Sequence, residues 1–148
     1  MAVGGRRRAR VAALQALYEA DTSRHTAEQA LQRIVARERL PKEPAAFARD
    51  LIQGVLAQQD QIDRLIAQAA TAWPLEQLPP VERNILRLAI HEMLGDNGTP
   101  VGAVINEAVE LAKSFGGENS AKFVNGVLGA IERQRGQLRT DQAVKGRG

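Results

Sequence analysis

The stretch LPPVERNILRLAIHEML, residues 78–94, indicates most clearly which kind of fold the chain adopts. After two prolines, apolar residues recur at intervals of three and four: Ile85, Leu86, Ala89, Ile90, Met93 and Leu94. That spacing places them on one face of an α-helix, and such a face is buried against other elements. Residues 81–94 are therefore predicted to form a helix that packs into a core.

Helical patterns continue on both sides of this segment. No run of β-branched residues alternates over the length of a strand, so an all-α fold of about seven helices is expected. Towards the N-terminus, helices are expected at residues 7–20, 26–38 (capped by Thr26) and 44–70, the last with a gap in its apolar spacing near Gln58. Towards the C-terminus, helices are expected at residues 102–114 and 120–133.

Two Pro-containing pairs, Trp73-Pro74 and Pro79-Pro80, bracket a connector with one predicted helical turn at residues 75–78. This connector is predicted to divide a single domain, residues 1–135, into bundles of about 6–72 and 75–135. The apolar periodicity is lost after Gly136, so residues 136–148 are expected to form a flexible basic tail.

The composition excludes several classes of protein. Of the 148 residues, 44% are hydrophobic but only 3% aromatic, so the core is expected to consist of Ala, Leu, Ile and Val. The absence of Cys excludes a disulfide scaffold, a thiol nucleophile and a thiolate zinc site. No apolar run approaches the roughly 18 residues that span a bilayer. The expected location is the cytoplasm, without membrane association.

Charge is distributed unevenly along the chain. Residues 1–10 carry four Arg and no acidic residue, and residues 133–148 carry five basic residues and one acidic residue. The segment between them carries 11 basic and 16 acidic residues. This partition favours a local anion site at one or both ends, although basic termini that only aid solubility would give the same pattern.

The sequence contains no signal for catalysis. Its two histidines, His25 and His91, lie far apart in the sequence, and neither belongs to a motif with metal-binding spacing. Structural roles suit both. Glu107 and Glu110 have ordinary helix-surface spacing. Phosphate-binding loops and nucleophile elbows are also absent. We expect neither an enzyme nor a resident metal or cofactor.

The Arg-rich start of the first helix favours nucleic acid as a ligand. Guanidinium groups are well suited to hydrogen-bond phosphate oxygens. Four positive charges at a helix N-terminus also oppose the helix dipole, so helix stability alone does not explain these arginines. Tyr18, three turns after Arg7 on the same stripe, could stack on an unpaired base or be an ordinary core-edge residue. Lys122 and Phe123 follow a helix start rich in polar groups, where Phe123 fits a core position or a second stacking platform.

Four segments together resemble the bacterial NusB family of transcription antitermination factors. They are RRRARVAALQALYEAD (6–21), FARDLIQGV (47–55), LPPVERNILRLAIHEML (78–94) and VINEAVELAKSFGGENSAKFVNGVL (104–128). The last is the most specific, because generic helix composition does not readily produce it. The resemblance implies two roughly perpendicular helical bundles.

The resemblance also implies a function and partners. The family binds single-stranded boxA RNA in the leaders of ribosomal RNA operons, together with a small-subunit ribosomal protein that acts as NusE. With other Nus factors on RNA polymerase, it promotes read-through of terminators. Family members occur as monomers and dimers, so a homodimer is compatible with the resemblance, and one formed through the first helix would hide the RNA site.

The family's RNA-binding positions correspond to particular residues of this chain. Glu82 matches a position near the RNA and could accept a hydrogen bond from an exocyclic amine. Asn119 stands where other members can carry Asp, which removes a negative charge and implies tighter or less selective binding. The complete set implied by the resemblance is Arg6, Arg7, Arg8, Arg10, Tyr18, Glu82, Asn119, Lys122 and Phe123.

Two alternative functions remain open at this stage. Some ribosomal RNA cytosine methyltransferases carry a NusB-like N-terminal domain, but they also need a cofactor-binding domain and a nucleophilic Cys, which is absent here. A helical adaptor that binds only proteins would need no RNA affinity. It would keep its function after residues 6–10 were neutralised.

Overall fold

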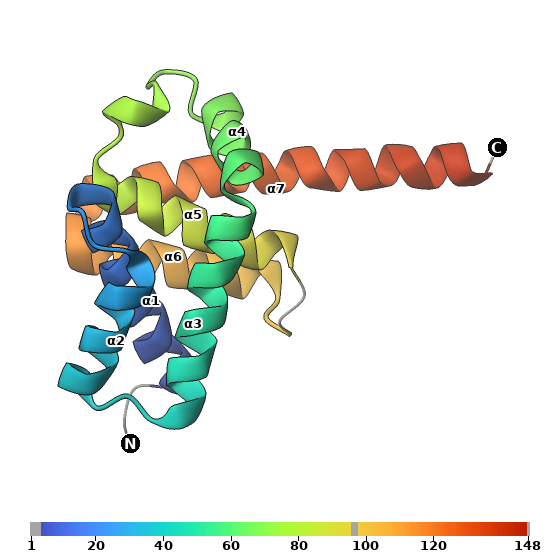
Figure 1. Ribbon diagram of the computed structural model, residues 1–148. Coiled ribbons are helices and arrows are strands. Elements are labelled where there is room, and N and C mark those ends of the chain that lie inside the picture. The colour runs from blue at the N-terminus through green and yellow to red at the C-terminus, as the bar shows by residue number, and fades with distance from the viewer. Residues whose placement is uncertain (1–3, 96–97, 148) are drawn as a thin grey trace.

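The computed structural model describes residues 4–95 and 98–147, with side chains described through residue 136. These residues form seven α-helices and one 3-10 turn without a strand, which confirms the predicted all-α class (Figure 1). The helices are α1 (Gly5–Thr22), α2 (Ala27–Glu38), α3 (Lys42–Ala57), α4 (Gln59–Ala69), α5 (Pro80–Leu94), α6 (Val101–Gly116) and α7 (Glu118–Arg147), with the 3-10 turn η1 at Leu75–Gln77.

Helices α1, α2 and α3 pack together as the N-terminal bundle, with α1 in contact with both others. The buried face of α1 carries mostly small residues, among them Ala9, Ala13 and Ala16, which are fully buried. Small side chains allow the neighbouring helices to approach closely. Thr26 caps α2 as predicted: its hydroxyl accepts from the Gln29 amide, and the Gln29 side chain accepts from the Thr26 amide, a capping box.

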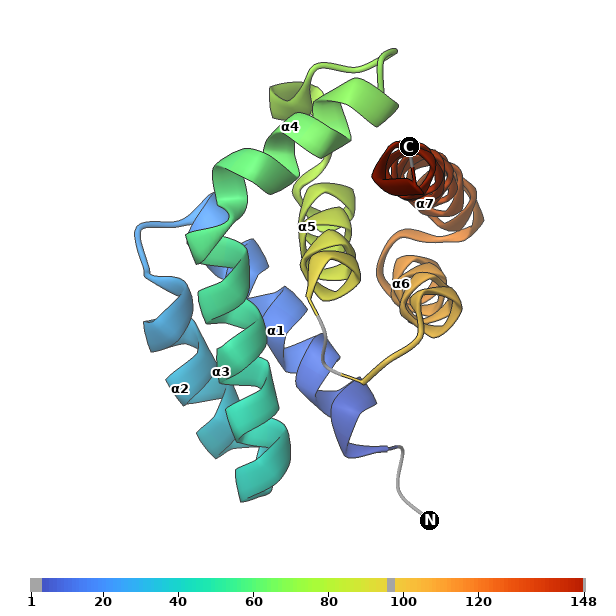
Figure 2. The same ribbon diagram turned by 90° about the vertical axis from the view of Figure 1, so that its right-hand side faces the viewer.

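Helix α5 connects the two halves of the molecule. It packs against α1 and α3 on one side and against α6 and α7 on the other (Figure 2), and it also contacts α4. Seven consecutive residues, from Asn84 to Ile90, are buried. Figure 2 looks nearly along α5, α6 and α7 while α1, α2 and α3 lie across the view, so the two sets of helices cross steeply. One hydrophobic cluster extends through both sets.

The predicted long helix at residues 44–70 is two helices. α3 ends at Ala57 and α4 starts at Gln59, with the break at Gln58, where the apolar spacing has its gap. The Gln58 side chain is 2.7 Å from Nδ1 of His91, which ties the break to α5. As a result, α4 packs against α5 and α7 as well as α3, although the sequence groups its residues with the N-terminal bundle.

Helix α7 continues beyond the predicted end of the last helix. Within the part of α7 whose side chains are described, up to Gly136, the buried apolar residues are Ala121, Val124, Val127, Leu128 and Ile131. The backbone then stays helical to Arg147 and projects past the other helices (Figure 1). The sequence indicates a flexible tail there because apolar periodicity is lost. Yet the segment lacks Pro and includes Gln, Leu, Arg and Ala, which favour helix without requiring a buried face.

In the part of the chain that the structure describes, no helix has the length and apolar character needed to cross a membrane.

Candidate nucleic-acid interface

The four arginines at the start of α1 lie in different environments. Arg6 is exposed; its Nη1 donates to Thr99 Oγ1 at 2.9 Å, and its guanidinium lies 4.7 Å from the centre of the Phe47 ring. Arg8 is half-buried, and its Nη2 donates to the backbone carbonyl of Glu38 at 3.0 Å. These contacts place Arg6 against α3 and Arg8 against the end of α2, so the cluster spreads across the N-terminal bundle.

Arg7 forms an exposed bidentate ion pair with Glu107 of α6. Its Nη2 and Nε donate to the two carboxylate oxygens at 2.8 and 3.1 Å, and the Arg7 side chain remains 48% exposed. The hydrogen bond from Arg7 lowers the pKa of Glu107. The Glu107 carboxylate occupies the same donors that a phosphate would use, so an anionic ligand would have to compete with it.

Arg10 is buried, and its geometry does not support the prediction that it contacts RNA. Its Nε and Nη2 donate to both carboxylate oxygens of Glu92 at 2.8 and 2.7 Å, and only 6% of the residue is exposed. Arg10 follows Ala9 on the inner face of α1, where Glu92 of α5 faces it. The sequence offered one signal for this pairing, a carboxylate within the apolar pattern of residues 81–94. We leave Arg10 out of the proposed RNA contacts.

At the other end of α1, Tyr18 borders an open hollow of about 340 Å³. Tyr18 is 42% exposed and Phe115, at the end of α6, is 41% exposed. The remaining lining residues are Leu14, Gln15, Glu19, Thr22 and Val81. Phe115 continues the apolar stripe of α6 by one turn, so the sequence pattern indicates a core residue. No helix in the described part of the chain covers Phe115. The rings of Tyr18 and Phe115 therefore both remain accessible at the same hollow.

Glu82 directly follows Val81, one of the residues that line this hollow, in the first turn of α5. Its Oε1 lies 3.4 Å from the point where a Cβ on Gly116 would sit, and the Ser120 side chain would collide with that same Cβ. Gly116 therefore permits the close approach of the starts of α5 and α7 to the end of α6. The Ser120 hydroxyl is buried and has no hydrogen-bond partner among the described residues, and Asn119 beside it is exposed.

The structure separates Lys122 from the hollow at Tyr18. Lys122 is exposed and lines a second hollow, of about 430 Å³, between α6 and α7, together with Asn106, Lys113 and Asn125. The two hollows share no lining residue. Phe123 is half-buried and packs against the core, as one of its two predicted roles required.

A polar network fixes Tyr18 relative to Glu82. Asp21, one turn after Tyr18, accepts hydrogen bonds from Arg83 Nη2 at 2.6 Å and from Asn84 Nδ2 at 3.1 Å. Arg83 also donates to the carbonyls of Leu75 and Leu78 in the connector. The end of α1, the connector and the start of α5 are thus held together beneath the exposed rings.

Among the residues that the structure describes, no group of three or more His, Asp or Glu side chains is placed to hold a metal ion. The exposed features are aromatic rings, guanidinium groups and a carboxylate. Such groups stack on bases, bind phosphates and accept hydrogen bonds.

Comparison with known proteins identifies relatives over nearly the whole chain. The sequence profile of the NusB family matches residues 7–133. The transcription antitermination protein NusB of Dehalococcoides mccartyi is 48% identical over 128 residues, covering 86% of this chain and 90% of that protein. The corresponding protein of Chloroflexus aggregans is also 48% identical, covering 85% of each chain.

Solved structures resemble the fold equally well. NusB of T. maritima superposes with a TM-score of 0.82 at 40% identity, covering 90% of this chain and 93% of that one. A chain from a crystal structure of antitermination factors NusB and NusE in complex with double-stranded RNA gives a TM-score of 0.81 at 29% identity. That match covers 88% of this chain and 97% of the other.

Proposed function

The chain belongs to the NusB family, and from this membership we propose that it is an RNA-binding transcription antitermination factor. It binds a boxA-type single-stranded RNA together with NusE, and with other Nus factors it promotes read-through by RNA polymerase in the cytoplasm. The NusB and NusE complex with double-stranded RNA supports NusE as the partner and RNA as the class of ligand. The protein acts by binding and performs no chemistry of its own.

The observation that carries the proposal is the hollow between Tyr18 and Phe115, with Glu82 at its edge. An unpaired base can stack on an accessible ring, and every base has a face for such stacking. The Glu82 carboxylate can accept a hydrogen bond from an exocyclic amine, which adds preference for particular bases. A site that bound only phosphates would need neither group.

The remaining predicted residues extend the proposed RNA path on both sides of this hollow. Arg6, Arg7 and Arg8 supply phosphate contacts, with Arg7 exchanging Glu107 for a phosphate. At the other end, Asn119 is exposed next to the Glu82 region, and Lys122 contributes positive charge at the groove between α6 and α7. Phe123 supports this surface from its half-buried position.

The test is fluorescence anisotropy of a labelled boxA-type RNA and a shuffled control RNA, with and without NusE, at two salt concentrations. We expect selective binding that NusE strengthens. Tyr18→Ala should weaken binding of the boxA-type RNA by about 1–3 kcal/mol, the usual contribution of one stacked base.

A matched control is Trp73→Ala. Trp73 is also an exposed aromatic residue, 53% accessible, but it lies in the connector and does not line the Tyr18 hollow. This variant should bind RNA like the wild type. Equal binding of both RNAs that disappears at higher salt would reduce the protein to a nonspecific polyanion binder and contradict the proposal.

A further inference from the structure

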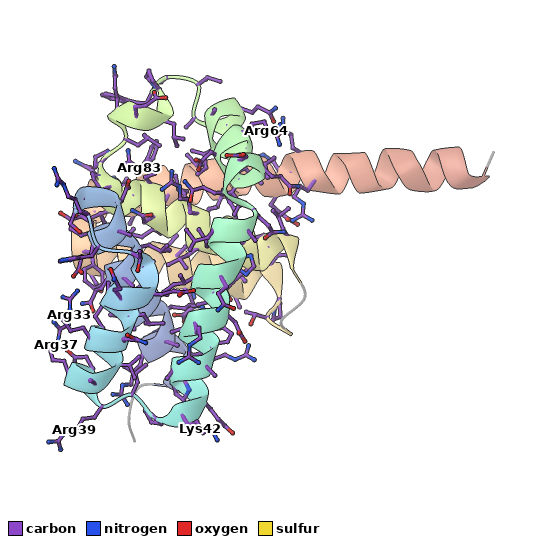
Figure 3. All side chains as sticks on the ribbon, viewed as in Figure 1. Arg33, Arg37, Arg39, Lys42, Arg64 and Arg83 are labelled. Atoms are coloured by element: carbon purple, nitrogen blue, oxygen red, sulfur yellow. The ribbon has the colours of Figure 1, made fainter. Side chains whose placement is uncertain are left out.

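The turn between α2 and α3 carries three exposed basic residues, Arg37, Arg39 and Lys42, which we call the turn patch. Figure 3 shows their side chains along the outer edge of α2 and at the start of α3, with Arg33 further up the same edge. Arg33 is paired with Glu19, and Arg37 contacts Glu38 at 3.1 Å. Among the described residues, the side chains of Arg39 and Lys42 form no hydrogen bond or ion pair.

Arg39 has an unusual backbone conformation. It ends α2 in the left-handed region, at φ 51° and ψ 49°, and it is the only residue other than Gly with positive φ among those described. Gly is the usual residue at such a helix end, because a side chain there costs about 1–2 kcal/mol. Helix termination alone therefore favours Gly, and the Arg brings an unneutralised guanidinium in its place. Backbone strain of this kind is found preferentially at functional positions.

The turn patch is continuous with the Arg-rich start of α1. Arg8 donates to the Glu38 carbonyl, which brings its guanidinium onto the end of α2. Nearby, Gly5 packs so closely on Pro44 that a Cβ there would lie 2.9 Å from the Pro44 ring. The acidic residues of the turn are Glu38, engaged by Arg37, and Glu43. Positive charge is thus in excess here, although the middle of the chain is acidic overall.

We propose that the turn patch binds the phosphate backbone of RNA that flanks the segment read at Tyr18. This inference rests on the proposed function and extends its RNA footprint along the length of α1. Arg8 and Tyr18 are ten residues apart, about 15 Å along the helix. Because phosphates along a stacked strand are about 3.4 Å apart, an RNA at Tyr18 needs about four or five further nucleotides to reach the patch.

The experiment compares RNAs of two lengths. One is a core boxA-type RNA, and the others carry about six additional uridines at the 5′ or the 3′ end, enough to cover the distance along α1. Affinities are measured over a range of salt concentrations, with NusE present, for the wild type and for Arg39→Gly/Lys42→Gln. Arg64→Ala, on the exposed surface of α4 (Figure 3), serves as the control.

We expect the double variant to bind the core RNA like the wild type and one of the extended RNAs several-fold more weakly. For that RNA, the slope of the logarithm of the binding constant against the logarithm of the salt concentration should decrease in magnitude by about 1.4. Each of two lost single-strand phosphate contacts contributes about 0.7 to this slope. Arg39→Gly alone should unfold at a urea concentration no lower than the wild type, which excludes misfolding as the cause. Arg64→Ala should change the affinity for neither the core RNA nor the extended RNA.

Two outcomes would overturn the inference while leaving the proposed function intact. In one, the wild type binds the core and extended RNAs with equal affinity and salt dependence. In the other, the double variant loses affinity for NusE and none for RNA, which would assign the patch to a protein partner. Failure of the core RNA to bind selectively would instead contradict the proposed function itself.

Discussion

Two arginines on the same helix show how burial decides the role of a side chain. Arg7 and Arg10 are three residues apart, and each holds a glutamate with two hydrogen bonds. The Arg7 pair faces solvent, where a ligand can exchange with the carboxylate at little energetic cost. The Arg10 pair lies between α1 and α5, where only 7% of the Arg10 side chain and 3% of the Glu92 side chain are exposed. The first pair is available for binding, whereas the second joins two helices.

Removing Arg10 should strongly destabilise the fold. We expect Arg10→Met to lower the free energy of unfolding by about 3–5 kcal/mol, because it removes the bidentate cationic partner of the buried Glu92 carboxylate. Urea denaturation measures the change. Arg7→Met, which removes the exposed pair, should leave the midpoint unchanged, and Arg10→Met combined with Glu92→Leu should recover most of the loss. An Arg10→Met protein as stable as the wild type would exclude this structural role.

At the scale of elements, α3 and α5 pack closely together at Gly54 and His91. A Cβ on Gly54 would overlap the imidazole ring of His91, so only Gly fits at this contact. The ring is 2.7 Å from the Gln58 side chain, at the break between α3 and α4. Burial lowers the pKa of His91, although the neighbouring Glu92 opposes the shift. The α3–α5 contact is therefore built around a neutral histidine.

Acidification should weaken this contact. His91 has a lower pKa in the folded state than its ordinary value of about 6.5, so the unfolded chain takes up the proton first. This contribution to stability is complete above about pH 6.5 and is lost as the pH falls towards the folded pKa. Urea midpoints measured between about pH 7.5 and 5.5 should decline, and His91→Gln should flatten that decline. An equal slope in the variant would exclude His91 as the cause.

Sequence patterns predicted the helix faces, because burial of one stripe is a local property of each helix. The order of the helices and the Thr26 cap agree with those expectations, and the steep crossing of the two sets agrees with what the family resemblance implies. The break at Gln58 and the burial of Arg10 depend on α5, which is distant in sequence. The separation of Lys122 from Tyr18 likewise depends on how α6 and α7 pack. Such features depend on how helices distant in sequence pack together, and the apolar periodicity of a single helix does not predict that packing.

For the molecule as a whole, the described core ends before the last part of α7. Ile131 is the last buried apolar residue described, and Arg135 donates to the Met93 carbonyl at 2.7 Å. Residues 137–148 follow these contacts and carry three basic residues and one acidic residue. At the C-terminal end of the chain, the described core contacts therefore lie before residue 137, whereas three basic residues lie after it.

A chain that ends at Gly136 should separate these two contributions. We expect its urea midpoint to match that of the full chain, because the described core contacts are retained. Its affinity for RNA should fall at low salt and converge with that of the full chain at high salt, since the removed charges act through the ionic atmosphere. A large loss of stability would show that residues 137–148 contribute to the fold.

Helix α5 contacts both the N-terminal bundle and helices α6 and α7, and this position has a consequence for chimeric proteins. A crossover in the connector before Pro80 would combine the α1, α2, α3 and α4 of one relative with the α5, α6 and α7 of another. The resulting α5 would meet unfamiliar side chains along its contacts with α1 and α3, including the partners of Glu92 and His91. Productive recombination within the family must therefore exchange matched surfaces on both sides of α5, although the connector itself resembles a domain boundary.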